Sequence, residues 1–285
     1  MNTKIAAACV IYNPPENLIS NIGSYAGIVS LLIVVDNSEN PDGLLHATLQ
    51  RFTNVKIISY HENRGIAAAL NDAVKLATET NMDWILTMDQ DSCFDPEMAN
   101  RYISAFEQLP GKDKIGAIGP EFEFGKHQPA NSSLIPVTSL ITSGSLVNIK
   151  VINEVGGYNE KLFIDEVDHE FCYRAGLKGY GIFQLPGIFM KHALGNATAV
   201  RTPGSRKQIF KPLHSPVRLY YMVRNACYMN ATYKDSFPAA SRLRREDVLV
   251  RIKNNLLYGR NRMAILKYII RGYLDYKRNR FGKFQ

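Results

Sequence analysis

The sequence lacks several features that would assign it to a common protein class. Its four cysteines, Cys9, Cys93, Cys172 and Cys227, lie far apart and form no CxxC pair. This pattern predicts reduced, mostly buried thiols and suits a cytosolic protein. The longest strongly apolar run, residues 26–35, is far too short to cross a bilayer. We therefore expect a soluble protein, or one that binds at most to a membrane surface.

Two well-known nucleotide-binding loops are also absent. No GxGxxG follows the first predicted strand, and GxxxxGK[ST] occurs nowhere in the chain. The diphosphate of a bound nucleotide would therefore need another counter-charge. A divalent cation held by carboxylates, Mg²⁺ or Mn²⁺, would supply it.

Charge is distributed unevenly along the 285 residues, whose net charge is +8. Residues 1–199 contain 14 Lys/Arg and 22 Asp/Glu, a net charge of −8. Residues 200–285 contain 20 Lys/Arg and 4 Asp/Glu, a net charge of +16. A basic tail of this strength suits a polyanionic partner such as nucleic acid, anionic lipid headgroups or a phosphorylated acceptor.

The first part of the chain alternates short apolar runs with helical patterns. Strands are predicted at residues 4–12, 30–37, 54–61, 83–91 and 114–122, and helices at 65–80 and 95–109. Such an alternation predicts an α/β fold with parallel βαβ units, in which ligands bind at the carboxyl ends of the strands. Four strand ends carry polar residues, at 12–13, 36–37, 61–65 and 89–91.

Two groups of carboxylates stand out against this pattern. Asp89 and Asp91 end an apolar strand in "ILTMDQDSCF", which favours a divalent-cation site over a plain turn. A second group, Asp165, Glu166, Asp168 and Glu170, falls near the start of a helix predicted at 166–178. Helix capping explains some of these acids, but four are more than capping requires. A strand at 179–187 should follow, with His192 just beyond it.

The order and spacing of these motifs resemble the inverting GT-A glycosyltransferases of family 2, and within them a rhamnosyltransferase-like branch. The motifs, spread over about residues 4–225, are VIYNP, VVDNS, HENRGIAAALN, LTMDQDS, TSGSLVN and GGYNEKLFIDEVDHEFCYRAGLKGY. The resemblance implies a GT-A domain over residues 1–214, with a mixed, mostly parallel sheet and helices on both faces. A basic, mainly helical extension would follow at 215–285.

The resemblance also implies donor-binding residues. They are Tyr12, Asn13, Asp36, Asn63, Arg64, Gly65, Asp89 and Gln90. Asp36 matches the acid that hydrogen-bonds the pyrimidine base, and residues 63–65 match a loop near the base, ribose and diphosphate. Two alternatives stay open from the residues alone: Asp36 as a loop-capping acid, and Tyr12 as a packing residue rather than a stacking platform.

The metal ligands and the catalytic base follow in the same way. Asp89, Asp91 and His192 are the implied metal ligands, of which Asp91 is the firmer; an ordinary packed or solvated role for His192 stays open. Asp168 matches the general base. Asp165 and Glu166, which precede it directly, are the alternative bases.

The resemblance implies an inverting glycosyltransferase that takes a sugar from a dTDP- or UDP-sugar, with L-rhamnose from dTDP-L-rhamnose as the expected donor. The acceptor would be a saccharide or a lipid-diphosphate-linked saccharide in bacterial surface polysaccharide synthesis, such as that of O-antigen. UDP-galactofuranose is an alternative donor. A metal-dependent nucleotidyltransferase and a nucleic-acid-binding protein are the competing classes.

The basic tail allows three interpretations. Its helical segments interleave Tyr, Leu, Ile and Met with Arg and Lys. They could pack as a solvated appendage, bind nucleic acid, or lie on an anionic membrane surface. We favour the membrane because of the lipid-linked acceptors that the resemblance implies, and expect no nucleic acid. The protein would then be cytoplasmic, peripheral on the cytoplasmic face of the inner membrane; a homodimer interface is an equal use of these helices.

Overall fold

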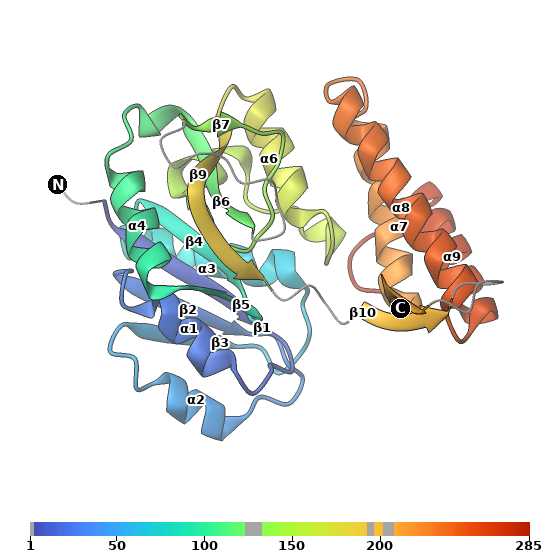
Figure 1. Ribbon diagram of the computed structural model, residues 1–285, viewed down its shortest axis with the longest axis horizontal. Helices are drawn as coiled ribbons and strands as arrows, with labels where there is room; N and C mark the ends of the chain where they lie inside the picture. Colours follow the sequence, from blue (N-terminus) through green and yellow to red (C-terminus); the bar gives the residue numbers. More distant parts are fainter. Residues whose placement is uncertain (1–2, 123–132, 193–196, 202–207) are drawn as a thin grey trace. The chain divides into compact units, whose positions relative to one another are not determined.

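The computed structural model describes residues 3–122, 133–192, 197–201 and 208–285 (Figure 1). The chain divides into two compact units. The sheet unit comprises Met1–Phe163 and Val167–Ala193, and the helical unit comprises Ile164–Glu166 and Leu194–Gln285. The tripeptide Ile164–Glu166 thus belongs with the C-terminal helices although it is far from them in sequence. Where the glycosyltransferase domain itself ends, placed at residue 214 from sequence, stays a prediction.

Most of the predicted elements of the sheet unit are confirmed within one or two residues at their ends. Its strands are β1 (Ile5–Ile11), β2 (Leu31–Asp36), β3 (Val55–Ser59), β4 (Trp84–Asp89), β5 (Ser92–Phe94), β6 (Ile115–Phe122), β7 (Ile135–Pro136), β8 (Ser145–Asn148) and β9 (Gly181–His192). Its helices are α1 (Leu18–Ala26), α2 (Gly43–Leu49), α3 (Ile66–Glu79), α4 (Pro96–Glu107), α5 (Ile149–Val155) and α6 (Val167–Leu177), with 3₁₀ turns at Lys112–Lys114 and Glu160–Leu162. The prediction that His192 lies beyond its strand is wrong, because β9 continues through Pro186 to His192.

The strands form a mixed sheet in the order β3-β2-β1-β4-β8-β6-β9-β5, with β7 paired to β9. The four strands β3-β2-β1-β4 run parallel, as the βαβ pattern predicts. β8 is antiparallel to both β4 and β6, and β5 is antiparallel to β9. The α/β fold with a mixed sheet expected from the sequence is therefore confirmed.

Helices cover both faces of the parallel part of the sheet. Successive residues of a strand point to opposite faces. Ala7 and Cys9 of β1 join the main hydrophobic core with Tyr25 of α1 and Tyr102 of α4. The alanine-rich α3 packs on β1 and β2 outside that cluster. Because both faces are buried, β1, β2 and β4 are almost entirely apolar instead of alternating with polar residues, whereas the edge strand β3 carries the exposed Lys56.

The helical unit contains three long helices, as the sequence of the tail predicts. They are α7 (Pro216–Tyr233), α8 (Pro238–Tyr258) and α9 (Arg262–Lys277), preceded by an antiparallel hairpin of β10 (Ala197–Arg201) and β11 (Gln208–Pro212) that was not predicted. Gly272 lets α9 approach α7 closely, since a Cβ there would lie 2.5 Å from the carbonyl oxygen of Tyr220. In the described part of the chain, no helix is both long enough and apolar enough to span a bilayer.

Candidate active site

The ends of the parallel strands lie at one edge of the sheet, as expected from the sequence. Ile11 pairs with Asp36 on β2, and Val10 pairs with Asp89 on β4. Asp36 in turn pairs with Ser59 at the end of β3. The polar residues that follow these strands therefore start from the same edge, where open α/β sheets bind their ligands.

Gln90 joins the ends of β1 and β4. Its Oε1 accepts from the backbone N–H of Tyr12 at 2.8 Å, and its Nε2 donates to the Tyr12 carbonyl at 3.2 Å. Asn21 of α1 donates to the Gln90 carbonyl at 3.0 Å. The side chain of Gln90 thus links the loop after β1 to the loop after β4 by hydrogen bonds, which accounts for a glutamine between the two aspartates. Tyr12 is 41% exposed at this edge, and Asn13 next to it adopts a left-handed conformation with φ 43°.

Asp36 is buried, with only 1% of its surface exposed. Its Oδ1 accepts from the backbone N–H of Ser38 at 3.0 Å, which is the loop-capping contact considered for this acid. Its Oδ2 lies 2.7 Å from Nε2 of His46, on α2. Sequence reasoning missed His46, because neither α2 nor a partner ten residues away was predicted for this aspartate.

The loop that leads into α3 is fixed by asparagine side chains. Asn37 Oδ1 accepts from the Arg64 N–H at 2.7 Å, and Asn63 Oδ1 accepts from the Gly65 N–H at 3.0 Å. Gly65 has φ 85°, and a Cβ there would lie 2.6 Å from both the ring and the carbonyl oxygen of Phe163. Only glycine fits this position without displacing its neighbours.

Arg64 is held but remains partly open to solvent. Its guanidinium lies 4.4 Å above the Tyr60 ring and 3.2 Å from Asp72. Its side chain is 42% exposed. A guanidinium positioned in this way at the strand ends can contact a diphosphate bidentately.

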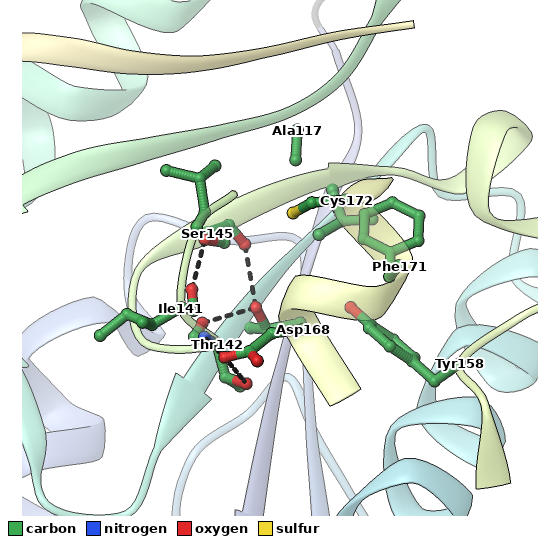
Figure 2. A pocket seen from close by; sticks show the side chains of 11 residues that line it. Ala117, Ile141, Thr142, Ser145, Tyr158, Asp168, Phe171 and Cys172 are labelled. Atoms are coloured by element: carbon green, nitrogen blue, oxygen red, sulfur yellow. Dashed lines mark hydrogen bonds between the residues drawn. The ribbon is translucent and has the colours of Figure 1, made fainter. Parts of the chain in front are cut away.

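Two consecutive residues of the segment before β8 link the two groups of carboxylates. Thr142 donates its backbone N–H to Asp168 Oδ2 at 2.9 Å (Figure 2). Ser143 donates its hydroxyl to Asp89 Oδ2 at 2.5 Å. Asp89 and Asp168, 79 residues apart in sequence, therefore accept hydrogen bonds from adjacent residues of one loop. The motif TSGSLVN contains both residues, but sequence reasoning gave neither a role.

Asp168 lies in the first turn of α6, as predicted, and is partly exposed. Its Oδ1 accepts from the N–H of His169 at 2.8 Å. Beside it lies a small pocket whose lining is mostly apolar (Figure 2). The lining residues are Thr87, Ala117, Leu140, Ile141, Thr142, Ser145, Val147, Tyr158, Asp168, Phe171 and Cys172. Burial raises the pKa of Cys172 to about 12, so this thiol stays protonated at neutral pH and is no nucleophile.

The alternative bases Asp165 and Glu166 are engaged within the helical unit. Arg218 forms a bidentate pair with Asp165, with Nη2 at 2.7 Å and Nε at 2.9 Å. Arg244 Nε lies 2.8 Å from Glu166 Oε2. Both acids therefore have arginine partners from the helical unit.

Asp91 lies in the turn between β4 and β5. The backbone of His192 pairs with Ser92, directly after Asp91, whereas the His192 side chain lies outside the described part of the structure. Across the described residues, no group of three or more His, Cys, Asp or Glu side chains is arranged to hold a metal. Mg²⁺ is usually held by one or two carboxylates and completes its shell with substrate phosphates and water. The carboxylate oxygens of Asp89 and Asp91 are of the chemical type that such a cation takes as ligands.

Comparison with known proteins gives the same family that the sequence motifs resemble. Residues 12–153 match the model of "Glycosyl transferase family 2". The chain is 32% identical over 246 residues to "dTDP-rhamnosyl transferase RfbF" of Shigella flexneri, covering 79% of each protein. The chain therefore belongs to glycosyltransferase family 2, in its rhamnosyltransferase-like branch. It is a nucleotide-sugar glycosyltransferase, and membership of this family does not favour a nucleotidyltransferase or a nucleic-acid-binding protein.

Solved structures share the fold at low sequence identity. S. aureus TarS residues 1–349 in complex with UDP-GlcNAc superimpose with a TM-score of 0.52 at 14% identity, covering 99% of this chain and 94% of that one. GalNAc-T7 with UDP, GalNAc and Mn²⁺ gives a TM-score of 0.58 at 11% identity, covering 97% of this chain. This chain spans 56% of GalNAc-T7 and 43% of a longer TarS chain, which matches with a TM-score of 0.54 at 18% identity. These likenesses support the GT-A fold.

Proposed function

We propose that the protein transfers L-rhamnose from dTDP-L-rhamnose, with inversion, to a saccharide acceptor of a bacterial surface polysaccharide. The donor is inferred from the 32% identical dTDP-rhamnosyl transferase. The observation that carries the chemistry is the attachment of Asp89 and Asp168 to the adjacent residues Ser143 and Thr142. One loop thereby sets the distance between an acid on the diphosphate side and an acid on the acceptor side.

On the diphosphate side, Asp89 and Asp91 would hold Mg²⁺ or Mn²⁺, with His192 as a further ligand. When bound, such a cation neutralises the charge that grows on the leaving diphosphate. Ser143 keeps Asp89 in one orientation through its hydroxyl. Arg64 would contact the same diphosphate, and Asp36, which His46 contacts at 2.7 Å, would accept from the N3–H of the thymine base.

On the acceptor side, Asp168 is the proposed general base. It would take the proton of the acceptor hydroxyl as the oxygen attacks the anomeric carbon, and the bond to the diphosphate breaks on the opposite face. Both oxygens of Asp168 are oriented by backbone N–H groups, of Thr142 and His169. The ion pairs of Asp165 and Glu166 with arginines favour Asp168 over these two acids.

A donor panel tests this function. Purified protein is titrated with dTDP-L-rhamnose, UDP-galactofuranose and UDP-GlcNAc in the presence of Mn²⁺. The proposal expects dTDP-L-rhamnose to bind at least 10-fold more tightly than the UDP-sugars. Tighter binding of UDP-galactofuranose would show that this sugar nucleotide, not dTDP-L-rhamnose, is the donor. Donor binding that is unaffected by EDTA would contradict the proposed divalent cation.

We also propose that the exposed face of α9 binds an anionic membrane surface, where a lipid-linked acceptor would lie. The exposed positions of α9 are Arg262, Met263, Leu266, Lys267, Ile270, Tyr273, Leu274 and Lys277. This face therefore presents apolar and basic residues without an acid, and the one acid of α9, Asp275, is buried. Basic helices with exposed apolar and aromatic residues bind in the interface of anionic bilayers. A two-fold dimer through the same face would bring like charges together, which disfavours that alternative.

Flotation with vesicles tests the membrane contact. The full chain should float with vesicles of phosphatidylcholine and phosphatidylglycerol but not with phosphatidylcholine alone. Ile270→Glu should abolish flotation, whereas Leu44→Glu, at an 81% exposed leucine of α2, should not. An unaffected Ile270→Glu variant would remove the α9 face from the proposal. A wild-type dimer that Ile270→Glu converts to a monomer would assign the face to self-association instead.

A further inference from the structure

The tripeptide Ile164–Glu166 adopts a backbone conformation that its own residues do not favour. Asp165 and Glu166 have φ 63° and 69°, and the preceding Phe163 has φ 66°. None of the three is glycine, so each left-handed conformation is disfavoured and persists only where surrounding contacts enforce it. The chain continues directly into Val167, the first residue of α6, and Asp168 is the second.

Asn225 of α7 holds the backbone of this tripeptide. Its Nδ2 donates to the carbonyl oxygens of Ile164 and Asp165, at 2.7 and 3.1 Å. Its Oδ1 accepts from Arg224 Nε at 3.0 Å, which fixes the orientation of the amide. Asn225 is fully buried, so an alternative partner from solvent is excluded.

Arg224 connects this amide to the C-terminal end of the chain. It is fully buried and donates to the Gly282 carbonyl at 2.7 Å. Its guanidinium also lies about 5 Å from the rings of Tyr221 and Phe281. The orientation of Asn225 is therefore secured by contacts within α7 and with the residues that follow α9.

Two arginines hold the side chains of the same tripeptide. Arg218 of α7 makes a bidentate pair with Asp165, and Arg244 of α8 pairs with Glu166. The side chains of Arg244 and Glu166 are only 12% and 13% exposed, so water screens this pair less than a surface ion pair.

We propose that Arg218, Asn225 and Arg244 are positioning residues that clasp Ile164–Glu166 and thereby fix the start of α6 and the place of Asp168. The proposal rests on Asp168 as the base of the proposed transfer. The helical unit then contributes to catalysis through the chain that leads into α6. Loss of the clasp frees the backbone two residues before the base, and small misplacements of a catalytic group lower the rate of the chemical step.

Three variants and a control test the clasp in the full-length protein. Arg218→Ala removes the partner of Asp165, Arg244→Ala that of Glu166, and Asn225→Asp replaces the donor to two carbonyl oxygens by an acceptor. Arg251→Ala is the control, because the partners of this α8 arginine, Asp247 and His214, lie outside the tripeptide. Each clasp variant should lower kcat about 10-fold and leave the KM for the donor within 2-fold. The charge-exchanged double variant Asp165→Arg with Arg218→Asp should recover most of the kcat lost in Arg218→Ala.

Hydrogen exchange provides a readout that does not depend on activity. Amides in a peptide that covers residues 163–170 should exchange at least 10-fold faster in the clasp variants and at the wild-type rate in Arg251→Ala. Unchanged exchange in both Arg218→Ala and Asn225→Asp would overturn the clasp, whatever the activity. If instead every protein, including the control, fails to transfer rhamnose, the proposed donor fails, and the exchange result still decides the clasp.

Discussion

The candidate catalytic acids of the sheet unit and of the helical unit are held in different ways. Asp89 and Asp168 in the sheet unit accept hydrogen bonds from a hydroxyl and from backbone N–H groups. Asp165 and Glu166 in the helical unit are paired with arginines. A neutral donor orients a carboxylate and leaves its negative charge available to a cation or a proton, whereas an arginine neutralises that charge. This difference is the basis for proposing Asp89 and Asp168 for the chemistry, and Asp165 and Glu166 for holding the fold.

The largest effect is expected where this comparison is tested on catalysis. Asp168→Asn should lower kcat by about 10³-fold, because the amide cannot accept the acceptor proton. Asp165→Asn should lower it only about 10-fold, through the clasp. Initial rates at saturating donor measure both. Equal losses in the two variants would erase the distinction between the two groups of acids.

The predictable part of the site is the part that the parallel strands build. β1, β2 and β4 were predicted within two residues because each is an apolar run that ends on a polar residue. Their register then brings Asp36 and Asp89 to one edge without further information. The bridging contacts of Thr142 and Ser143 were not predicted, since TSGSLVN carries no periodicity that reports its partners.

Contacts from distant segments were beyond reach of the sequence. His46 lies on a short helix with a weak pattern, and its contact with Asp36 depends on how α2 returns toward β2. The clasp of Asp165 by Arg218 joins residues 53 apart, and no local pattern indicates it. The short strand β8 runs antiparallel to β4, which the βαβ pattern does not anticipate.

A second expected effect concerns the stability of the sheet unit, at the loop before α3. Gly65→Ala should lower the free energy of unfolding by about 3 kcal/mol, because the new Cβ meets Phe163 and φ is positive. Gly43→Ala is the matched control, since a Cβ there has nothing within 4 Å. Urea unfolding of both variants provides the measurement. A Gly65→Ala variant as stable as the control would show that the loop before α3 can relax.

A smaller effect is expected at Asp36, the acid proposed to bind the thymine base. His46→Ala removes the 2.7 Å contact to Asp36 and should raise the donor KM about 5-fold, which corresponds to the loss of one hydrogen bond, with kcat unchanged. Steady-state kinetics with varied donor tests this. A fall in kcat at constant KM would mean that His46 does not act through donor binding.

The smallest effect concerns pH and the helical unit. Burial and the neighbouring Arg251 lower the pKa of His214 to about 4. The unfolded state, with a histidine pKa near its ordinary value, binds the proton first as the pH falls. The contribution of His214 to the free energy of unfolding is therefore fully present above about pH 6.5 and is lost as the pH falls towards 4. We expect a loss of about 1 kcal/mol, because partial exposure of the ring to solvent weakens the effect. Urea unfolding at pH 7 and pH 5 measures the change in the free energy of unfolding. The His214→Gln variant should lack the part of this change that comes from His214. The same pH dependence in the variant and the wild type would contradict the prediction.

The most direct test of the central claim, that one group of acids binds the donor complex and another performs proton transfer, is a donor titration by calorimetry. dTDP-L-rhamnose with Mn²⁺ is titrated into the wild type, Asp91→Asn and Asp168→Asn. The account predicts wild-type affinity for Asp168→Asn and roughly 100-fold weaker binding for Asp91→Asn. Equal weakening in both variants, or wild-type affinity in Asp91→Asn, would contradict it.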